Sequence, residues 1–147
     1  MDLQEQITMK GELNIVLRNQ DGVIKETRNI PNLVVTVGKN YIASRMVGTA
    51  STVMGWMALG TGVTAPIVGD TTLETEAGRV AVSSFTASTN TVTATATFGA
   101  GTATGAITEA GILNAASVGT MLCRTTFSVV NKGAGDSLAV SWTVTVS

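Results

Sequence analysis

The chain has 147 residues, of which 44% are hydrophobic and 13% charged, and its net charge is −1. This length corresponds to one domain with a sizeable core and excludes a second large domain. Ten acidic and nine basic residues give no electrostatic reason to expect a nucleic acid or an anionic membrane as partner. Histidine is absent and Cys123 is the single cysteine, which removes the usual general base, the commonest metal ligand and any intrachain disulfide. We therefore expect no enzyme, no cofactor, no metal site and no small-molecule substrate.

The charged fraction is about half of the roughly 25% that is usual for soluble domains. Soluble monomers normally carry more charge on their surface. In a chain rich in threonine, alanine and glycine, this scarcity suggests that much of the outside faces other protein, as in a shell, a fibre or a tight oligomer. The alternative is a weakly charged monomer that hydroxyl groups keep in solution.

The first six residues, 1–6, are polar and acidic and lack the basic and apolar regions of a secretory signal. We therefore expect the chain to be made and kept in a cytoplasm. Two long uncharged stretches are interrupted by glycine, threonine, serine, asparagine or proline, so no membrane span is predicted. We expect residues 1–147 to form a single β-sandwich domain, with 1–12 as a candidate N-terminal arm.

Hydrophobic and polar residues alternate over residues 12–18 and again over 23–27, on either side of Asp21 and Gly22. Alternation is typical of a strand with one buried face, and an Asp-Gly pair readily takes the positive φ of a hairpin turn. The sequence therefore predicts an N-terminal hairpin. A calcium loop at Asp21 is the local alternative, but the ladder of carboxylates that such a loop requires is missing.

The next segments are a short β-branched strand over 32–37, a short helix over 38–47 and a strand over 53–60. A long loop follows over 60–70, and long loops are often functional or lie at interfaces. Asp70 is a plausible N-cap for a helical turn over 71–74, which would place Glu74 and Glu76 in solvent.

From Arg79 onward the pattern is almost wholly that of strands, over residues 80–85, 92–98, 106–113, 121–130 and 138–146. A glycine-rich connection over 99–105 separates the second of these from the third. Seven to nine strands with glycine-rich turns predict an all-β fold. We expect an antiparallel β-sandwich or jelly roll with an N-terminal hairpin and one short helix.

Few residues are candidates for a chemical role. Gly60 and Gly62 lack the spacing of a phosphate-binding loop, which favours a simple turn. Glu109 is a lone charge in an apolar region, and we expect it to form a structural salt bridge with Arg79 or Arg124, within a subunit or across an interface. Cys123 has no neighbouring base and is expected to be a small core residue.

Several short blocks resemble small structural proteins of tailed bacteriophages. The blocks are WMALGTG (56–62), TAP (64–66), GDTTL (69–73), EAGRV (76–80), ITEAGILN (107–114), MLCRTTF (121–127), NKG (131–133) and VSWTV (140–144). The N-terminal hairpin, followed by residues 32–35 and 38–43, is also similar to the openings of phage structural proteins. The resemblance covers roughly residues 10–147.

The resemblance implies a virion component without enzymatic activity, most like a capsid decoration or cement protein on the outer surface of the head. Its implied partners are the major capsid protein and neighbouring copies of itself, as a homotrimer. The alternatives are a tail, baseplate or fibre-attachment protein and, from another class, a receptor- or carbohydrate-binding module.

The candidate contacts lie in the hydrophobic segment 7–17, in the long loop 60–70 and among the isolated charges. The alternative for both segments is ordinary packing within the chain, because interface and core residues look alike in one sequence. The residues that we expect at interfaces are Ile7, Met9, Leu13, Trp56, Val63, Pro66, Ile67, Arg79, Glu109 and Arg124.

Overall fold

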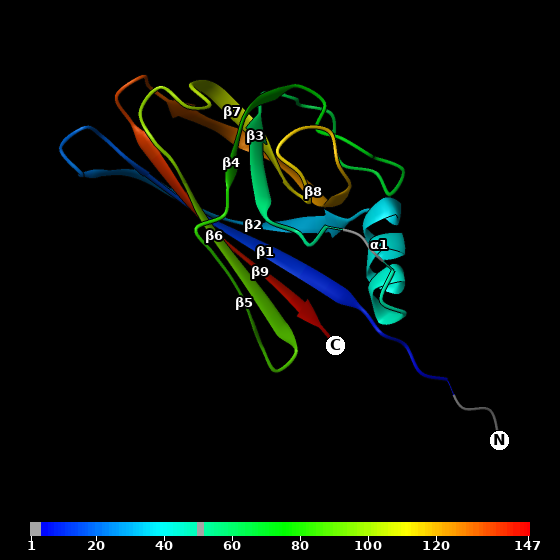
Figure 1. Cartoon of the computed structure of the whole chain (residues 1–147). Helices are drawn as coiled ribbons and strands as arrows, with labels where there is room; N and C mark the ends of the chain where they lie inside the picture. The colour runs from blue at the N-terminus through cyan, green and yellow to red at the C-terminus, as the bar shows by residue number, and fades with distance from the viewer. Residues whose placement is uncertain (1–3, 50–51) are drawn as a thin grey trace.

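The structure, a computed structural model, describes residues 4–49 and 52–147, and within them it contains nine strands and one helix (Figure 1). In chain order, the elements are β1 (Met9–Arg18), β2 (Ile24–Val34), α1 (Thr36–Met46), β3 (Trp56–Gly60), β4 (Glu76–Ala81), β5 (Ser84–Ser88), β6 (Thr91–Phe98), β7 (Gly105–Leu113), β8 (Met121–Lys132) and β9 (Ser137–Val146).

All strand pairs are antiparallel, and the strands form one curled sheet in the order β4-β3-β7-β8-β2-β1-β9-β6-β5. The long strand β2 belongs to both halves, because it pairs with β1 along most of its length and with β8 through Leu33 and Val34. The two halves enclose the core, as in a sandwich whose sheets share a strand. The expected all-β fold, with its N-terminal hairpin and one short helix, is confirmed.

The hairpin forms where the alternation and the Asp-Gly pair predict it. Gly22 has a φ of 81°, and the amides of Gly22 and Val23 donate to the backbone and side-chain oxygens of Asn19. Leu13, with its alternate neighbours Ile15 and Leu17, points into the core.

The core lies between the two halves of the sheet and includes alternate residues of β6 over 94–98 and of β9 over 138–144. Trp142 of β9 is fully buried, and its indole Nε1 donates to Asn32 Oδ1 over 2.8 Å. Cys123 is also fully buried, as expected, and burial raises the pKa of its thiol far above the usual range. The thiol is therefore held in its unreactive, protonated form.

Several element boundaries differ from those predicted. The segment expected as a strand over 32–37 is divided, since Val34 ends β2 and Thr36 begins α1. The segment expected as one strand over 80–85 is also divided, because the chain crosses from the edge strand β4 to the opposite edge strand β5. Val82 and Ser83 make this crossing, and their amides donate to the carbonyls of Gly55 and Thr95.

Two further expectations are wrong. No helical turn follows Asp70. Its carboxylate instead accepts a hydrogen bond from the amide of Ile67, which lies three residues earlier in the chain. The expected arm over 1–12 is shorter, because β1 begins at Met9 and residues 9–12 pair within the sheet; residues 1–3 lie outside the described part of the chain.

Helix α1 packs closely on β8 because Gly38 has no side chain. A Cβ at Gly38 would lie 2.2 Å from the carbonyl oxygen of Leu122. The helix interior would otherwise favour alanine over glycine by about 0.5–1 kcal/mol. The close approach therefore explains a glycine in the first turn of the helix.

We expect Gly38→Ala to lower the free energy of unfolding by about 1–3 kcal/mol, because the helix must move away from β8. Urea unfolding of both proteins measures this change. Gly69→Ala is the matched control, since a Cβ there meets nothing within 4 Å, and it should change stability by less than about 0.5 kcal/mol. A more stable Gly38→Ala protein would show that helix propensity outweighs the contact.

Candidate functional site

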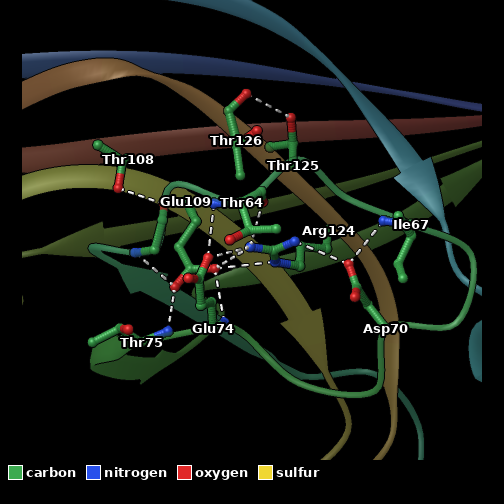
Figure 2. A network of polar contacts seen from close by, with 11 residues as sticks. Thr64, Ile67, Asp70, Glu74, Thr75, Thr108, Glu109, Arg124, Thr125 and Thr126 are labelled. Carbon is green, nitrogen blue, oxygen red and sulfur yellow. Dashed lines mark hydrogen bonds and ion pairs between the residues drawn. The ribbon is translucent and has the colours of Figure 1, made fainter.

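The loop between β3 and β4, residues 61–75, has no helix or strand of its own and is fixed by side chains of β7 and β8 (Figure 2). We call this segment the 61–75 loop. Its ends are joined by a hydrogen bond from the amide of Thr61 to the carbonyl of Thr75 over 2.9 Å. The rest of the loop is shaped by one carboxylate and one guanidinium.

The carboxylate of Glu109 on β7 is completely buried and lies under the loop. Its Oε1 accepts hydrogen bonds from the amides of Gly62 at 3.0 Å and Thr75 at 2.7 Å, while Oε2 accepts one from the amide of Glu74 at 3.0 Å. These contacts join the two ends of the loop to the same side chain. A buried carboxylate thus provides the acceptors that the irregular backbone needs.

Arg124 on β8 neutralises this carboxylate and connects it to the far side of the loop. Its Nε and Nη2 donate to Glu109 Oε2 over 3.0 and 2.9 Å, and Nη1 donates to Asp70 Oδ2 over 2.9 Å. Nη2 also donates to the carbonyl of Thr64 over 3.0 Å. Arg124 is only 2% exposed, and Figure 2 shows its guanidinium between Glu109 and Asp70.

Gly60 at the end of β3 and Gly62 in the loop make room for the carboxylate. A Cβ on Gly60 would lie 2.5 Å from Glu109 Oε1, and a Cβ on Gly62 would lie 2.6 Å from the same atom. The pair therefore serves a close approach of backbone to carboxylate and not only a turn. The hydroxyl of Thr108 adds a hydrogen bond to the carbonyl of Gly62 over 2.7 Å.

Glu74 adds a second, more exposed carboxylate at the edge of the site. Its Oε2 accepts from the amide of Thr64 over 2.8 Å and lies 3.7 Å from Arg124 Nη2. The hydrogen bond from Thr64 holds the pKa of Glu74 below its usual value of 4.5, and Arg124 adds to this effect. The carboxylates of Asp70, Glu74 and Glu109 therefore surround the guanidinium of Arg124, and these contacts hold the loop in place.

The loop presents aliphatic side chains to solvent although its backbone is fixed. Val63 is 76% exposed and Ile67 62% exposed, Val68 is also exposed, and Pro66 is half-buried. The carbonyl of Val68 accepts from the amide of Thr36 at the start of α1 over 2.8 Å. Because hydrogen bonds hold the loop backbone at several points, its exposed aliphatic residues have defined positions.

The structure separates the residues expected at interfaces into three groups. Val63, Ile67 and Ile7 are exposed and free to contact a partner, whereas Met9, Trp56, Pro66 and Arg79 are half-buried. Leu13, Glu109 and Arg124 are buried within the chain, so the expectation that they contact a partner is wrong. Leu13 packs in the core, and the two charges hold the 61–75 loop.

The expected salt bridge of Glu109 is formed with Arg124 and lies within the chain. Arg79, the other candidate, pairs with Glu76 at 2.6 Å instead. Its Nη1 donates to the carbonyls of Ala115 and Val118 over 2.8 and 3.0 Å. Arg79 therefore fixes the turn between β7 and β8 rather than the 61–75 loop.

Sequence reasoning missed one further charged cluster, at the turn between β8 and β9. Lys132 is buried, and its Nζ donates to the carbonyl of Gly99 over 2.8 Å. Burial lowers the pKa of Lys132, while nearby Asp136 opposes that effect. A hydrogen bond from Lys25 lowers the pKa of Asp136. An Asn-Lys-Gly sequence looks like an ordinary solvated turn, so the pattern carries no signal of this burial.

No group of three or more potential metal ligands is present within residues 4–49 and 52–147. Over the same residues, no helix has the length and apolar character needed to cross a membrane. Comparisons with protein-family models, with curated proteins and with solved structures found no match to the chain.

We expect Glu109→Gln to lower the free energy of unfolding by about 2–4 kcal/mol, because it removes the fully buried charge partner of Arg124 and leaves this arginine only the partly exposed carboxylates of Asp70 and Glu74. Denaturant unfolding measures the loss. Hydrogen exchange should show that the amides of Gly62, Glu74 and Thr75 lose protection first. Glu76→Gln, which breaks a more exposed pair, is the control and should change stability by less than about 1 kcal/mol. Unchanged protection in Glu109→Gln would contradict this role.

The contact between Thr64 and Glu74 should weaken only in acid. Because the pKa of Glu74 is lower in the folded chain than in the unfolded one, its stabilising effect is complete above pH 4.5 and is lost as the pH falls through the lowered value. An NMR titration of the Glu74 carboxyl carbon and the Thr64 amide measures this directly. A midpoint at or above pH 4.5 would disagree with the geometry.

Proposed function

We propose that this protein is a non-enzymatic structural component of a tailed bacteriophage particle, a decoration protein that binds the outer surface of the head between capsomers. Its proposed partners are the major capsid protein and neighbouring copies of itself in a homotrimer. The short sequence blocks that resemble phage structural proteins support the setting.

The proposal rests on the 61–75 loop, whose backbone is held by the buried side chains of Glu109 and Arg124 while its aliphatic side chains face solvent. Protein association usually loses free energy when side chains and loops become ordered. In the 61–75 loop this ordering is already achieved within the chain, through Glu109 and Arg124. Val63 and Ile67 are thus presented in a form that can dock without further ordering of the backbone.

The use of charge within the chain agrees with a protein-facing surface. Among the described residues, at least ten charged side chains stand in ion pairs with one another. These charges are compensated within the chain, which is only 13% charged. Interface centres are depleted in charge, so such a surface suits contact with other protein subunits.

Binding of this kind would stabilise a shell by linkage. A protein that binds the assembled lattice and not its dissociated subunits shifts the equilibrium toward the intact shell. Contacts with several subunits at once raise the effective affinity of a module whose individual contacts are weak.

A carbohydrate-binding role has less support, because sugar faces stack on exposed aromatic rings. Within the described residues, Phe85 is the aromatic side chain that is more than a third exposed, at 38%, while Trp142 is buried and Trp56 and Tyr41 are half-buried. These rings do not form an exposed platform.

The proposal predicts that Ile67→Asp weakens binding to heads assembled without this protein by at least about tenfold, because it places a charge in the contact. Cosedimentation of purified protein with such heads measures the affinity. Val23→Asp is the matched control: Val23 is 59% exposed in the turn between β1 and β2, at the opposite end of the molecule from α1 (Figure 1). If the unchanged chain does not bind heads, or binds only tails, the decoration role is wrong.

A further inference from the structure

The residues before β1 form an extended, exposed arm. We call residues 4–8 the N-terminal arm; they are exposed and contain no helix or strand. Its last residue, Thr8, exchanges two backbone hydrogen bonds with Ser147, at 2.6 and 2.8 Å, so the arm leaves the body beside the end of β9. Figure 1 shows the arm leading away from the sheet past α1. Within it, Ile7 is 72% exposed.

An apolar cavity of about 310 Å³ opens between α1 and the strands β5, β6 and β9. The described residues that line it are apolar apart from Tyr41; they include Ile42, Phe85, Val92, Trp142 and Val144. An apolar lining of this kind suits an apolar side chain. Two of its lining residues, Phe85 and Val146, are 38% exposed, so the cavity is accessible from outside.

The cavity adjoins an unpaired strand edge. β5 ends the sheet and, within the described part of the chain, pairs only with β6. All five of its residues are exposed, and one of them is Phe85 of the cavity. A free strand edge is a template for an extended segment, whose alternate side chains can enter adjacent pockets.

We propose that the N-terminal arm of one copy pairs with the free edge of β5 in a neighbouring copy and inserts Ile7 into the apolar cavity beside it. The arm has the extended form that the edge requires, and it carries an aliphatic side chain that the cavity can accept. Without this contact, Ile7 and Phe85 stay exposed on a weakly charged protein.

The arm of the same copy does not reach this edge. β9 and β6 lie between β1 and β5, so a segment paired with the outer edge of β5 would lie about 19 Å from the line of β1. Thr8 is held to Ser147 by two backbone hydrogen bonds, and the Cα of the adjacent Ile7 lies about 3.8 Å from that of Thr8. With these bonds in place Ile7 does not reach the outer edge of β5 in its own copy, so a second copy is the fitting donor.

The proposed contact joins two different surfaces, the arm and the β5 edge. Such a heterologous contact forms a ring when the rotation closes, and three copies would give the homotrimer expected above. Self-association of this kind does not depend on the proposed role in a phage particle, and it is tested on the purified chain alone.

Light scattering coupled to size exclusion tests the proposal on the full chain. We expect a closed oligomer for the unchanged protein and a 15.0 kDa monomer for Ile7→Asp. The Val23→Asp protein, with a similarly exposed aliphatic residue replaced far from the arm, should keep the oligomeric mass. A monomeric unchanged protein, or an oligomer that persists in Ile7→Asp, would overturn the proposal.

A cysteine pair locates the contact. In a chain carrying Ile7→Cys and Phe85→Cys, oxidation should give covalent oligomers on a nonreducing gel, and the buried thiol of Cys123 does not interfere. A chain with Ile7→Cys and Val23→Cys should give none. An intrachain disulfide in the first protein would show that the arm occupies its own cavity, and equal crosslinking of both proteins would show a nonspecific contact; either result contradicts the proposal.

Discussion

The buried carboxylate of Glu109 is the constraint on which the outer face of β3, β7 and β8 depends. An ionised carboxylate that loses all contact with water is strongly unfavourable unless a charge partner and hydrogen-bond donors replace the solvent. Arg124 supplies the charge, and the backbone of the 61–75 loop supplies three amides. The loop follows a path over the sheet that satisfies Glu109, and that path places Val63 and Ile67 outward.

The register of two neighbouring strands brings the ion pair together. Glu109 lies opposite Thr126, and Arg124 lies opposite Gly111, so the two charged side chains are diagonal neighbours on the same face. Glycine at 60 and 62 lets the loop backbone approach the carboxylate. Rigid strands and close backbone approach thus convert an irregular segment into a defined surface, as a preorganised binding site requires.

The sequence predicts those parts of the fold that depend on local pattern. The hairpin at Asp21 and Gly22 and the strand ending at Val146 are found as expected, because alternation and turn chemistry act over a few residues. The chemistry at Asp70 is different: a side chain that could cap a helix instead meets Arg124, a partner 54 residues away in the sequence. Local patterns do not contain such partners.

The candidate site was predictable in part for the same reason. A lone glutamate among apolar residues indicates a paired charge, and Glu109 does pair with one of the two arginines considered. The sequence pattern does not show whether the ion pair forms within one chain or between two chains. Both charges were therefore expected at an interface. Leu13 illustrates the same limit, since a core residue and an interface residue have the same apolar character.

A side-chain-resolution reconstruction of the intact particle, with this chain traced in the density, would test the proposed role most directly. We expect copies on the head lattice, with the 61–75 loop in its present conformation and Ile67 against the major capsid protein. Density for the chain only on tails or fibres, or a loop that faces solvent in the particle, would contradict it.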